Sequence, residues 1–333
     1  MSRLLRLAVS LGDPNGIGPE VVMRAAAAFD GAAVVAVGSP AVLRAQAEAL
    51  GLGPVYEVSD PADAGRQPGL AVLDPTPDAV PAFHWGDVTA QGGRQSMEAV
   101  ARACDLALAG AVDGIVTAPI SKEAIARAGY AVPGHTEFLQ QRTGAETAVM
   151  VLAADLDAGP LRVALVTVHV PLAEVAHAVT ADRVGRVCRT LSAALERDLG
   201  IDAPRLAVFG LNPHAGDGGV IGTDEADVIV PALQALRDQG VGVDGPFPAD
   251  AFFGRASWRR YDAVVAMYHD QGLAPFKALA QGAGVNVTLG LPIVRTSPDH
   301  GTAFDLAGQG KADPSSMLAA LRLAAQMAER RLR

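Results

Sequence analysis

The sequence has no excess of positive charge and no long apolar run. Its 36 Asp and Glu residues outnumber 27 Lys and Arg residues, giving a formal net charge of −9. Nucleic-acid binding requires a basic face, so this balance argues against such a partner. No stretch of about 18 uncharged apolar residues occurs, so we expect no membrane helix. The N-terminal MSRLLRLAVSLGDP faintly resembles a signal peptide, but Arg6 and Asp13 interrupt its apolar run, and we expect a cytoplasmic protein.

Cysteines are also scarce. The two present, Cys104 and Cys188, are too few for a disulfide scaffold, and both lie in Ala- and Leu-rich segments with helical spacing. We therefore expect buried thiols. The chain is long enough, at 333 residues of which 50% are hydrophobic, for one large or two medium domains.

Short β-branched runs alternate with longer amphipathic segments along the chain. The predicted strands are 5–11, 32–38, 114–119, 148–154, 162–168, 205–211 and 262–268. The predicted helices are 19–29, 40–50, 94–110, 121–128, 172–178, 181–198, 223–239 and 313–332. This alternation indicates an α/β fold with substantially parallel strands. The Pro- and Gly-rich segment 65–87 is predicted to be a long surface excursion.

The glycine-rich stretch LGDPNGIGPEVV (11–22) joins a predicted strand to a predicted helix. It is not a P-loop, because no Gly-Lys-Ser/Thr follows. The spacing of Gly12, Gly16 and Gly18 also differs from the G-x-G-x-x-G dinucleotide fingerprint. A structural turn and a ligand-binding loop both remain open from the spacing alone.

Three histidines follow predicted strands: His169, His214 and His269. Ligands bind along the carboxyl edge of an open parallel sheet, so these imidazoles could converge there on a divalent transition metal. Each histidine could equally be an ordinary hydrogen-bonded residue. The neighbouring Asp217 and Asp270 could be ligands, partners of the ligands, or solvated loop carboxylates.

Two further groups of polar residues suit an anionic ligand. His135 and Thr136 open a helical run after Pro-Gly, where they could either cap the helix or face an anion at its N-terminus. Lys277 and Arg295 lie on either side of the otherwise apolar VNVTLGLPIV, which contains Asn286, and cations in such a setting either recognise phosphate or carboxylate or are solvated.

Motifs spread over the whole chain resemble a known family. HGTAFDLAGQGKADP (300–314) and GDPNGIGPE (12–20) are similar to segments of the isocitrate and isopropylmalate dehydrogenases. The closer resemblance is to the 4-hydroxythreonine-4-phosphate dehydrogenases of vitamin B6 biosynthesis. It rests, in order along the chain, on GDPNGIGPE, TAPISKEAI, GHTEFL, TVHVPL, GLNPHAGDGG, GPFPADAFF, AMYHDQGL, GVNVTLGLPIVRTSPDHGTA and FDLAGQGKAD.

The resemblance implies two α/β/α domains with the active site in the cleft between them. The first domain would comprise 1–137 and 298–333 and carry most cofactor contacts; the second, 138–297, would carry the metal histidines and the dimer interface. The family oxidises C3 of 4-phosphooxy-L-threonine with NAD and then releases carbon dioxide, yielding 3-amino-2-oxopropyl phosphate. It acts as a homodimer with shared active sites and one divalent ion per site, for which Zn, Co, Mn and Mg are the candidates.

The resemblance also implies residue roles. The metal ligands would be His169, His214 and His269. The substrate would be bound by His135, Thr136, Lys277, Asn286, Arg295 and Asp250. The acid–base residue would be Lys277, with Asp270 as the alternative. The cofactor would contact Gly12, Gly16, Gly18, His300, Gly301 and Asp305. A carboxylate at 305 would accept hydrogen bonds from the ribose diol and repel a 2′-phosphate, so NAD is expected over NADP.

Two alternatives stay open. Relatives with these motifs oxidise four-carbon acid-sugar phosphates or a cis-diol dicarboxylate. From a different class, a metal-dependent hydrolase of a phosphorylated metabolite would also use three histidines with nearby aspartates, but it has no evident need for the HGTAFDLAG segment.

Overall fold

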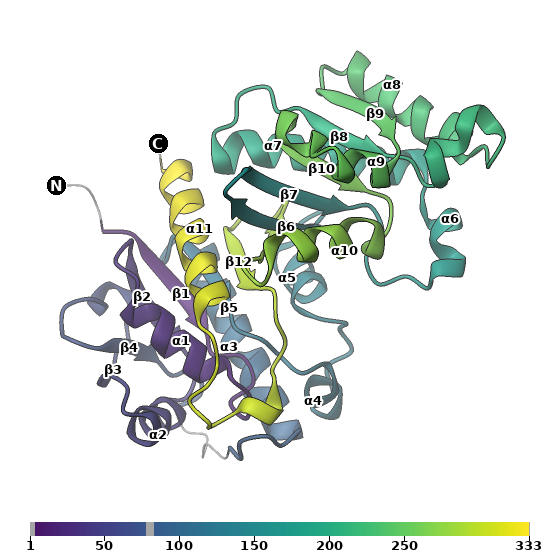
Figure 1. Cartoon of the computed structure of the whole chain (residues 1–333). Helices are drawn as coiled ribbons and strands as arrows, with labels where there is room; N and C mark the ends of the chain where they lie inside the picture. Colours follow the sequence, from purple (N-terminus) through teal and green to yellow (C-terminus); the bar gives the residue numbers. More distant parts are fainter. Residues whose placement is uncertain (1–3, 78–82, 333) are drawn as a thin grey trace. The chain divides into compact units, whose positions relative to one another are not determined.

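The computed structural model describes residues 4–77 and 83–332. They form two compact units: unit 1 is Met1–Ala145 with Leu291–Arg333, and unit 2 is Glu146–Gly290 (Figure 1). These bounds differ from the expected divisions after 137 and 297, because helix α5 (His135–Thr143) packs on α3 of unit 1 and strand β12 (Arg295–Pro298) pairs with β5 of unit 1.

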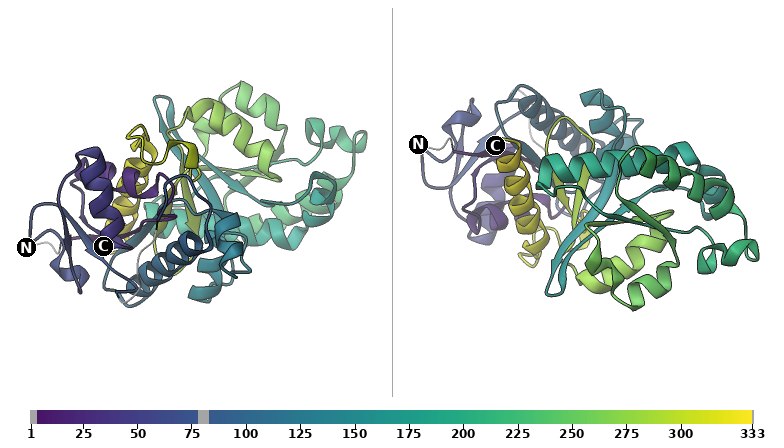
Figure 2. Two further views of the ribbon diagram at one scale, coloured as in Figure 1. Left: turned by 90° about the horizontal axis from the view of Figure 1, so that it is seen from below. Right: turned by 90° about the horizontal axis from the view of Figure 1, so that it is seen from above.

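Unit 1 contains a parallel sheet in the order β3-β4-β2-β1-β5-β12. Residues Leu7 to Ser10 of its central strand β1 are all buried, as expected when helices cover both faces of a parallel sheet. Helices α1 and α11 pack together on one face and α3 lies on the other (Figures 1 and 2). The other strands are β1 (Arg6–Ser10), β2 (Ala33–Val37), β3 (Val55–Glu57), β4 (Leu70–Leu73) and β5 (Gly114–Thr117). The other helices are α1 (Gly18–Ala27), α2 (Pro40–Leu50), α3 (Ala90–Leu108), α4 (Lys122–Arg127) and α11 (Ser315–Arg331), with 3-10 turns η1 (Pro61–Asp63) and η6 (Phe304–Leu306).

Unit 2 contains a mixed sheet in the order β11-β6-β7-β10-β8-β9. Strand β6 is antiparallel to β7 and β11, whereas β7, β10, β8 and β9 run parallel. The strands are β6 (Val149–Leu156), β7 (Gly159–Leu165), β8 (Leu206–Phe209), β9 (Val243–Phe247), β10 (Ala263–Ala266) and β11 (Val285–Leu289). The helices are α6 (Val175–Ala178), α7 (Ala181–Leu199), α8 (Val230–Asp238), α9 (Ala249–Gly254) and α10 (His269–Ala280), with short turns η2 (Leu172–Glu174), η3 (Pro213–Gly219), η4 (Glu225–Ile229) and η5 (Ser257–Arg260).

Buried aromatic residues close the core of unit 2. Phe209 at the end of β8 meets Phe252 of α9 edge-on, with ring centroids 5.2 Å apart. Phe276 of α10 and Trp258 of η5 belong to the same cluster. This core anchors α10, whose first residue is His269, against β6, β7 and β10.

The structure confirms the α/β class and every predicted strand and helix, with two differences. Strands β6, β7 and β11 pair antiparallel where parallel strands were expected. Residues Leu70–Leu73 form the buried strand β4, so the segment 65–87 is not a surface excursion throughout; its residues 78–82 lie outside the described part. Cys104 and Cys188 are buried free thiols, as expected.

Strands β3, β9, β11 and β12 and helices α9 and α10 are additional to the predicted elements. Within residues 4–77 and 83–332, no helix is both long and apolar enough to cross a membrane.

Candidate active site

Arg295 is a buried cation in unit 1. It begins β12 beside β5 and is 2% exposed. Its Nη2 and Nε donate to Oγ1 of Thr117, at 2.8 and 3.2 Å. Burial lowers the pKa of Arg295 to about 10, and the nearby Glu137 opposes this effect, so the guanidinium stays charged at neutral pH. A charged, planar donor group held in place by a neutral hydroxyl is suited to bind an oxyanion.

His135 lies next to this cation, at the first position of α5. The N-cap is Gly134 and no side chain caps the helix, so neither His135 nor Thr136 is used as a cap. Burial, together with the charge of Arg295, lowers the pKa of His135 well below 6.5, so its imidazole is neutral. Its Nε2 is shielded from solvent and has no hydrogen-bond partner among the described residues. The first turn of α5 and Arg295 therefore form one candidate site for an anion, called the anion-binding cluster below.

The three histidines predicted at strand ends all lie in unit 2, after the adjacent parallel strands β7, β10 and β8. The rings of His169 and His269 have centroids 5.9 Å apart. Nδ1 of His269 lies 2.7 Å from Oδ1 of Asp270, an arrangement that orients the ring and leaves its Nε2 for another partner.

His214 does not complete a metal site within one chain. It is exposed in the η3 turn after β8. Across the part of the chain that the structure describes, no group of three or more His, Cys, Asp or Glu side chains is arranged to hold a metal ion. The donor set of three imidazoles with a carboxylate on one of them still fits a divalent transition ion.

The remaining predicted substrate and catalytic residues are spread over unit 2. Asp270 and Lys277 are both exposed on α10 and, seven positions apart, lie on the same helix face. Asn286 lies on β11, and its Oδ1 is shielded from solvent without a partner among the residues described. Asp250 is exposed in the first turn of α9.

The opening loop packs against the protein's own backbone. A Cβ at Gly12, whose φ is +68°, would lie 2.2 Å from the carbonyl oxygen of Pro119. A Cβ at Gly16 would lie 2.7 Å from that of Thr302, and one at Gly18 would be 2.2 Å from that of Leu11. The glycines are thus required by internal packing. The N–H of Ile17 donates to Thr302 O at 2.9 Å, so this loop directly contacts the segment after β12.

That segment carries the other predicted cofactor residues. His300 Nδ1 lies 3.0 Å from the carbonyl oxygen of Gly301. Gly301 and Asp305 are exposed, and Asp305 lies in the η6 turn. The exposed backbone at Gly301 and the carboxylate of Asp305 could hydrogen-bond to a ribose diol.

Two polar residues of the opening loop had no predicted role. The Asn15 amide donates to Asp87 O (2.8 Å) and Thr89 Oγ1 (3.1 Å) and accepts from His84 N (2.8 Å), so it ties the 84–89 loop to β1. Asp13 is completely buried and accepts from Asn15 N. Burial raises the pKa of Asp13 to about 6. The only feature of the sequence that could have pointed to Asp13 was its position in the loop after a buried strand.

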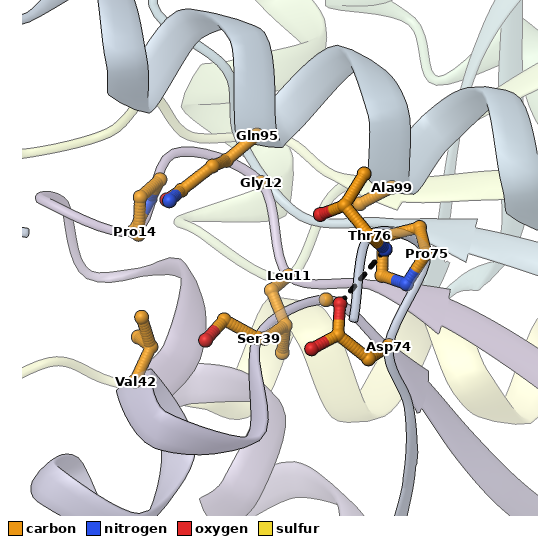
Figure 3. A pocket seen from close by; sticks show the side chains of 11 residues that line it. Leu11, Gly12, Pro14, Ser39, Val42, Asp74, Pro75, Thr76, Gln95 and Ala99 are labelled. Carbon is orange, nitrogen blue, oxygen red and sulfur yellow. Dashed lines mark hydrogen bonds between the residues drawn. The ribbon is translucent and has the colours of Figure 1, made fainter. Parts of the chain in front are cut away.

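A pocket in unit 1 lies at the carboxyl ends of β1, β2 and β4 and includes Gly12 (Figure 3). Asp74, whose Oδ1 accepts from Thr76 N at 2.9 Å, lines it. So do Ser39 Oγ and Gln95 Oε1, which are shielded from solvent and unpartnered within the described ranges. Sequence reasoning missed these residues because they belong to no motif, although the edge itself is where ligands bind in parallel sheets.

The chain has two α/β units, one holding Arg295 and His135 and the other a row of histidines, and the similar proteins are dehydrogenases. Residues 30–324 match the family described as pyridoxal phosphate biosynthetic protein PdxA. A protein of Chromobacterium violaceum named 4-hydroxythreonine-4-phosphate dehydrogenase is 50% identical over 97% of this chain and 96% of its own length. The crystal structure of the Klebsiella pneumoniae protein of that name is 40% identical, with a TM-score of 0.86 and 98% of each chain covered.

A terephthalate 1,2-cis-dihydrodiol dehydrogenase from Burkholderia xenovorans is 32% identical, with a TM-score of 0.67 and coverage of 97% of this chain and 98% of its own. The chain belongs to the PdxA family. It is an oxidoreductase, and the hydrolase alternative is thereby set aside.

Proposed function

We propose that the chain is an NAD- and divalent-metal-dependent 4-hydroxythreonine-4-phosphate dehydrogenase of pyridoxal 5′-phosphate biosynthesis. The observation that carries this proposal is the buried Arg295 beside the neutral His135 at the start of α5. The substrate is oxidised at C3, its hydride passing to NAD and its hydroxyl proton to a base. The resulting β-keto acid loses carbon dioxide and takes up a proton to give 3-amino-2-oxopropyl phosphate.

The anion-binding cluster would hold the substrate phosphate. Arg295 supplies a fixed charge with forked donors, and the first turn of α5 adds backbone N–H groups and the Thr136 hydroxyl. Because the imidazole of His135 is neutral, one of its ring nitrogens can donate to a phosphate oxygen without a second buried positive charge.

His169, His214 and His269 would hold the divalent ion. When bound, the ion supplies positive charge that stabilises negative charge on substrate oxygen, and the nicotinamide supplies the hydride acceptor. Asp270 would orient His269 through its Nδ1. Since the three histidines form no single-chain site among the described residues, we propose a homodimer whose subunits share the active sites.

Lys277 would move the proton near the reacting carbons, with Asp270, on the same face of α10, as the alternative base. Asn286, whose amide oxygen has no partner among the described residues, could accept from the substrate amine. Asp250 would lie at the edge of the substrate site. No nucleic-acid or membrane partner is part of this proposal, and the location would be cytoplasmic.

For the cofactor, exposed Asp305 and Gly301 would meet the adenosine ribose, with His300 beside them. Gly12, Gly16 and Gly18 act indirectly, by allowing the opening loop to support this segment. The carboxylate of Asp305 favours NAD over NADP. Equal turnover efficiency with the two cofactors would contradict this assignment.

A side-by-side turnover assay tests the proposal. Reduced-nicotinamide absorbance is followed with 4-phosphooxy-L-threonine, with four-carbon acid-sugar phosphates and with a cis-diol dicarboxylate, each across Zn, Co, Mn and Mg. We expect the phosphorylated amino acid to have the highest kcat/KM. Preference for the cis-diol, favoured by the likeness to the Burkholderia xenovorans enzyme, would replace the proposed substrate.

A further inference from the structure

The loop that carries His214 has an unusual backbone. Five consecutive residues, from His214 to Gly218, have positive φ, including 53° at His214, 53° at Ala215 and 45° at Asp217. Residues with a Cβ rarely adopt this left-handed conformation, and a run of them is not favoured by local preference alone. Contacts from elsewhere in unit 2 must therefore hold this turn.

The side chain of Glu225 makes several of these contacts. It is 5% exposed, and its Oε1 accepts from the backbone N–H groups of Leu211 and Asn212, both at 2.7 Å. Its Oε2 accepts from the Asn212 amide at 3.0 Å. A Cβ at Gly216 would lie 2.6 Å from the same Oε2, so the turn closes directly over the carboxylate. One buried side chain thus anchors the entry to the His214 turn, and Gly216 in the middle of the turn lies close to the same carboxylate.

Gln271 links this loop to the one that carries His269. Its Oε1 accepts from Met267 N at the end of β10, and its Nε2 donates to Gly210 O at the end of β8, both at 2.7 Å. Gly210 precedes the two residues that Glu225 holds. The hydrogen bonds of Gln271 and Glu225 therefore hold the backbone from Gly210 to Asn212, which leads directly into the turn that carries His214.

We propose that Gln271 and Glu225 are positioning residues that fix the loop carrying His214 and thereby set the affinity for the divalent ion. This inference rests on the proposed metal role of the histidines. The polar atoms of both side chains are taken up by hydrogen bonds within the protein, so neither residue is assigned contact with substrate or ion. Residues that orient metal ligands typically change metal affinity by about 10- to 100-fold when replaced.

The test replaces Gln271→Leu, which keeps the size of the side chain but removes both hydrogen bonds. Gln234→Leu is the matched control, because Gln234 is exposed on α8 and its amide donates a hydrogen bond to Asp238, one turn further along the same helix. Co²⁺ affinity is measured on the full-length protein by competition with a chromophoric chelator, together with the visible absorption of bound Co²⁺. We expect Q271L to bind Co²⁺ about 10- to 100-fold more weakly than Q234L, with an altered spectrum.

Glu225→Gln provides a second variant, with Glu196→Gln on the exposed face of α7 as its control. An amide at 225 would place a donor against the Asn212 amide, so E225Q should also weaken Co²⁺ binding and speed amide hydrogen exchange over 210–219 in the metal-free protein. Loss of thermal stability in Q271L and E225Q with Co²⁺ affinity equal to that of their controls would overturn the positioning role.

Wild type and His214→Ala separate the two proposals. If H214A binds Co²⁺ as tightly as wild type, or wild type does not bind it, the metal role of the histidines fails and the positioning role fails with it. If H214A abolishes tight binding and Q271L does not weaken it, only the positioning role fails.

Discussion

Arg295 and Thr117 lie 178 positions apart in the sequence, yet two hydrogen bonds join the guanidinium of one to the hydroxyl of the other. The bonds exist because β12 pairs with β5, which places Arg295 opposite Ile115, two residues before Thr117. The cation is thereby fixed in a buried position with its charge retained.

Thr117→Val should raise the KM for the phosphorylated substrate with little change in kcat. Valine has nearly the shape of threonine but cannot accept from Arg295, and a hydrogen bond to a charged group contributes about 1.5–3 kcal/mol, or roughly 10- to 100-fold. Steady-state kinetics measure the effect. Thr143→Val, which removes a hydroxyl bonded to the Leu139 carbonyl at the end of α5, is the control. A fall confined to kcat would contradict a role in holding the phosphate.

Gly16→Ala should weaken both folding and NAD binding. The new Cβ would meet Thr302 O at 2.7 Å, so the opening loop or the segment that leads to Asp305 must move. Overpacking of this kind costs about 1–3 kcal/mol of unfolding free energy. Urea unfolding and titration with NAD measure the two effects. Gly53→Ala is the control, because no atom lies within 4 Å of its Cβ position; equal behaviour of the two variants would show that the contact is unimportant.

Asp13→Asn should stabilise the protein more at pH 8 than at pH 4.5. Burial raises the pKa of Asp13 from 3.8 to about 6, so the folded state retains a proton that the unfolded state releases. Its stabilising contribution is fully present below pH 3.8 and is lost as the pH rises through about 6. Between the two test pH values the wild type should lose about 2 kcal/mol relative to the variant.

Urea unfolding of wild type and D13N at both pH values measures this difference. The exposed Asp157→Asn in the turn between β6 and β7 is the control. A difference between D13N and wild type that does not change with pH would mean that Asp13 is not buried as an uncharged acid.

Lys277→Ala should lower kcat by about 100-fold or more, the usual contribution of a general acid–base group, while the Kd for NAD stays within about twofold of wild type. Rapid-mixing kinetics and calorimetric NAD titration provide the two values. Lys122→Ala, at an exposed position that opens α4, is the control. Unchanged turnover would remove Lys277 from the chemistry and leave Asp270 as the candidate.

Some elements could be read from local pattern and others could not. Strand β1 was readable because its apolar run is bounded by a glycine loop. Helix α10 was not, because Gly272 and Pro275 lower its intrinsic helix propensity. Its buried Leu273 and Phe276 pack on the sheet and outweigh that preference. Strand β4 could not be predicted from the sequence, because a four-residue buried run inside a Pro- and Gly-rich segment carries little periodicity.

The features of the candidate site also divide into those that the sequence predicted and those that it did not. The placement of His169, His214 and His269 after strands followed from the sequence alone, because apolar runs end where strands end. Only the packed chain showed that the His169 and His269 rings are neighbours and that Glu225 and Gln271 hold the backbone just before His214. No spacing rule encodes contacts between side chains on separate loops.

The opening stretch GDPNGIGPE shows most clearly what each level decides. Its residue pattern alone predicts a loop from β1 to α1 and shows that this loop is neither a P-loop nor a dinucleotide fingerprint. The reason for its glycines becomes visible only in the folded chain: Gly12, Gly16 and Gly18 each lie so close to a backbone carbonyl that a Cβ would overlap it. For Gly16 that carbonyl belongs to Thr302, a residue almost the whole chain away. Local propensity selects a turn, but the excluded volume of distant backbone selects glycine.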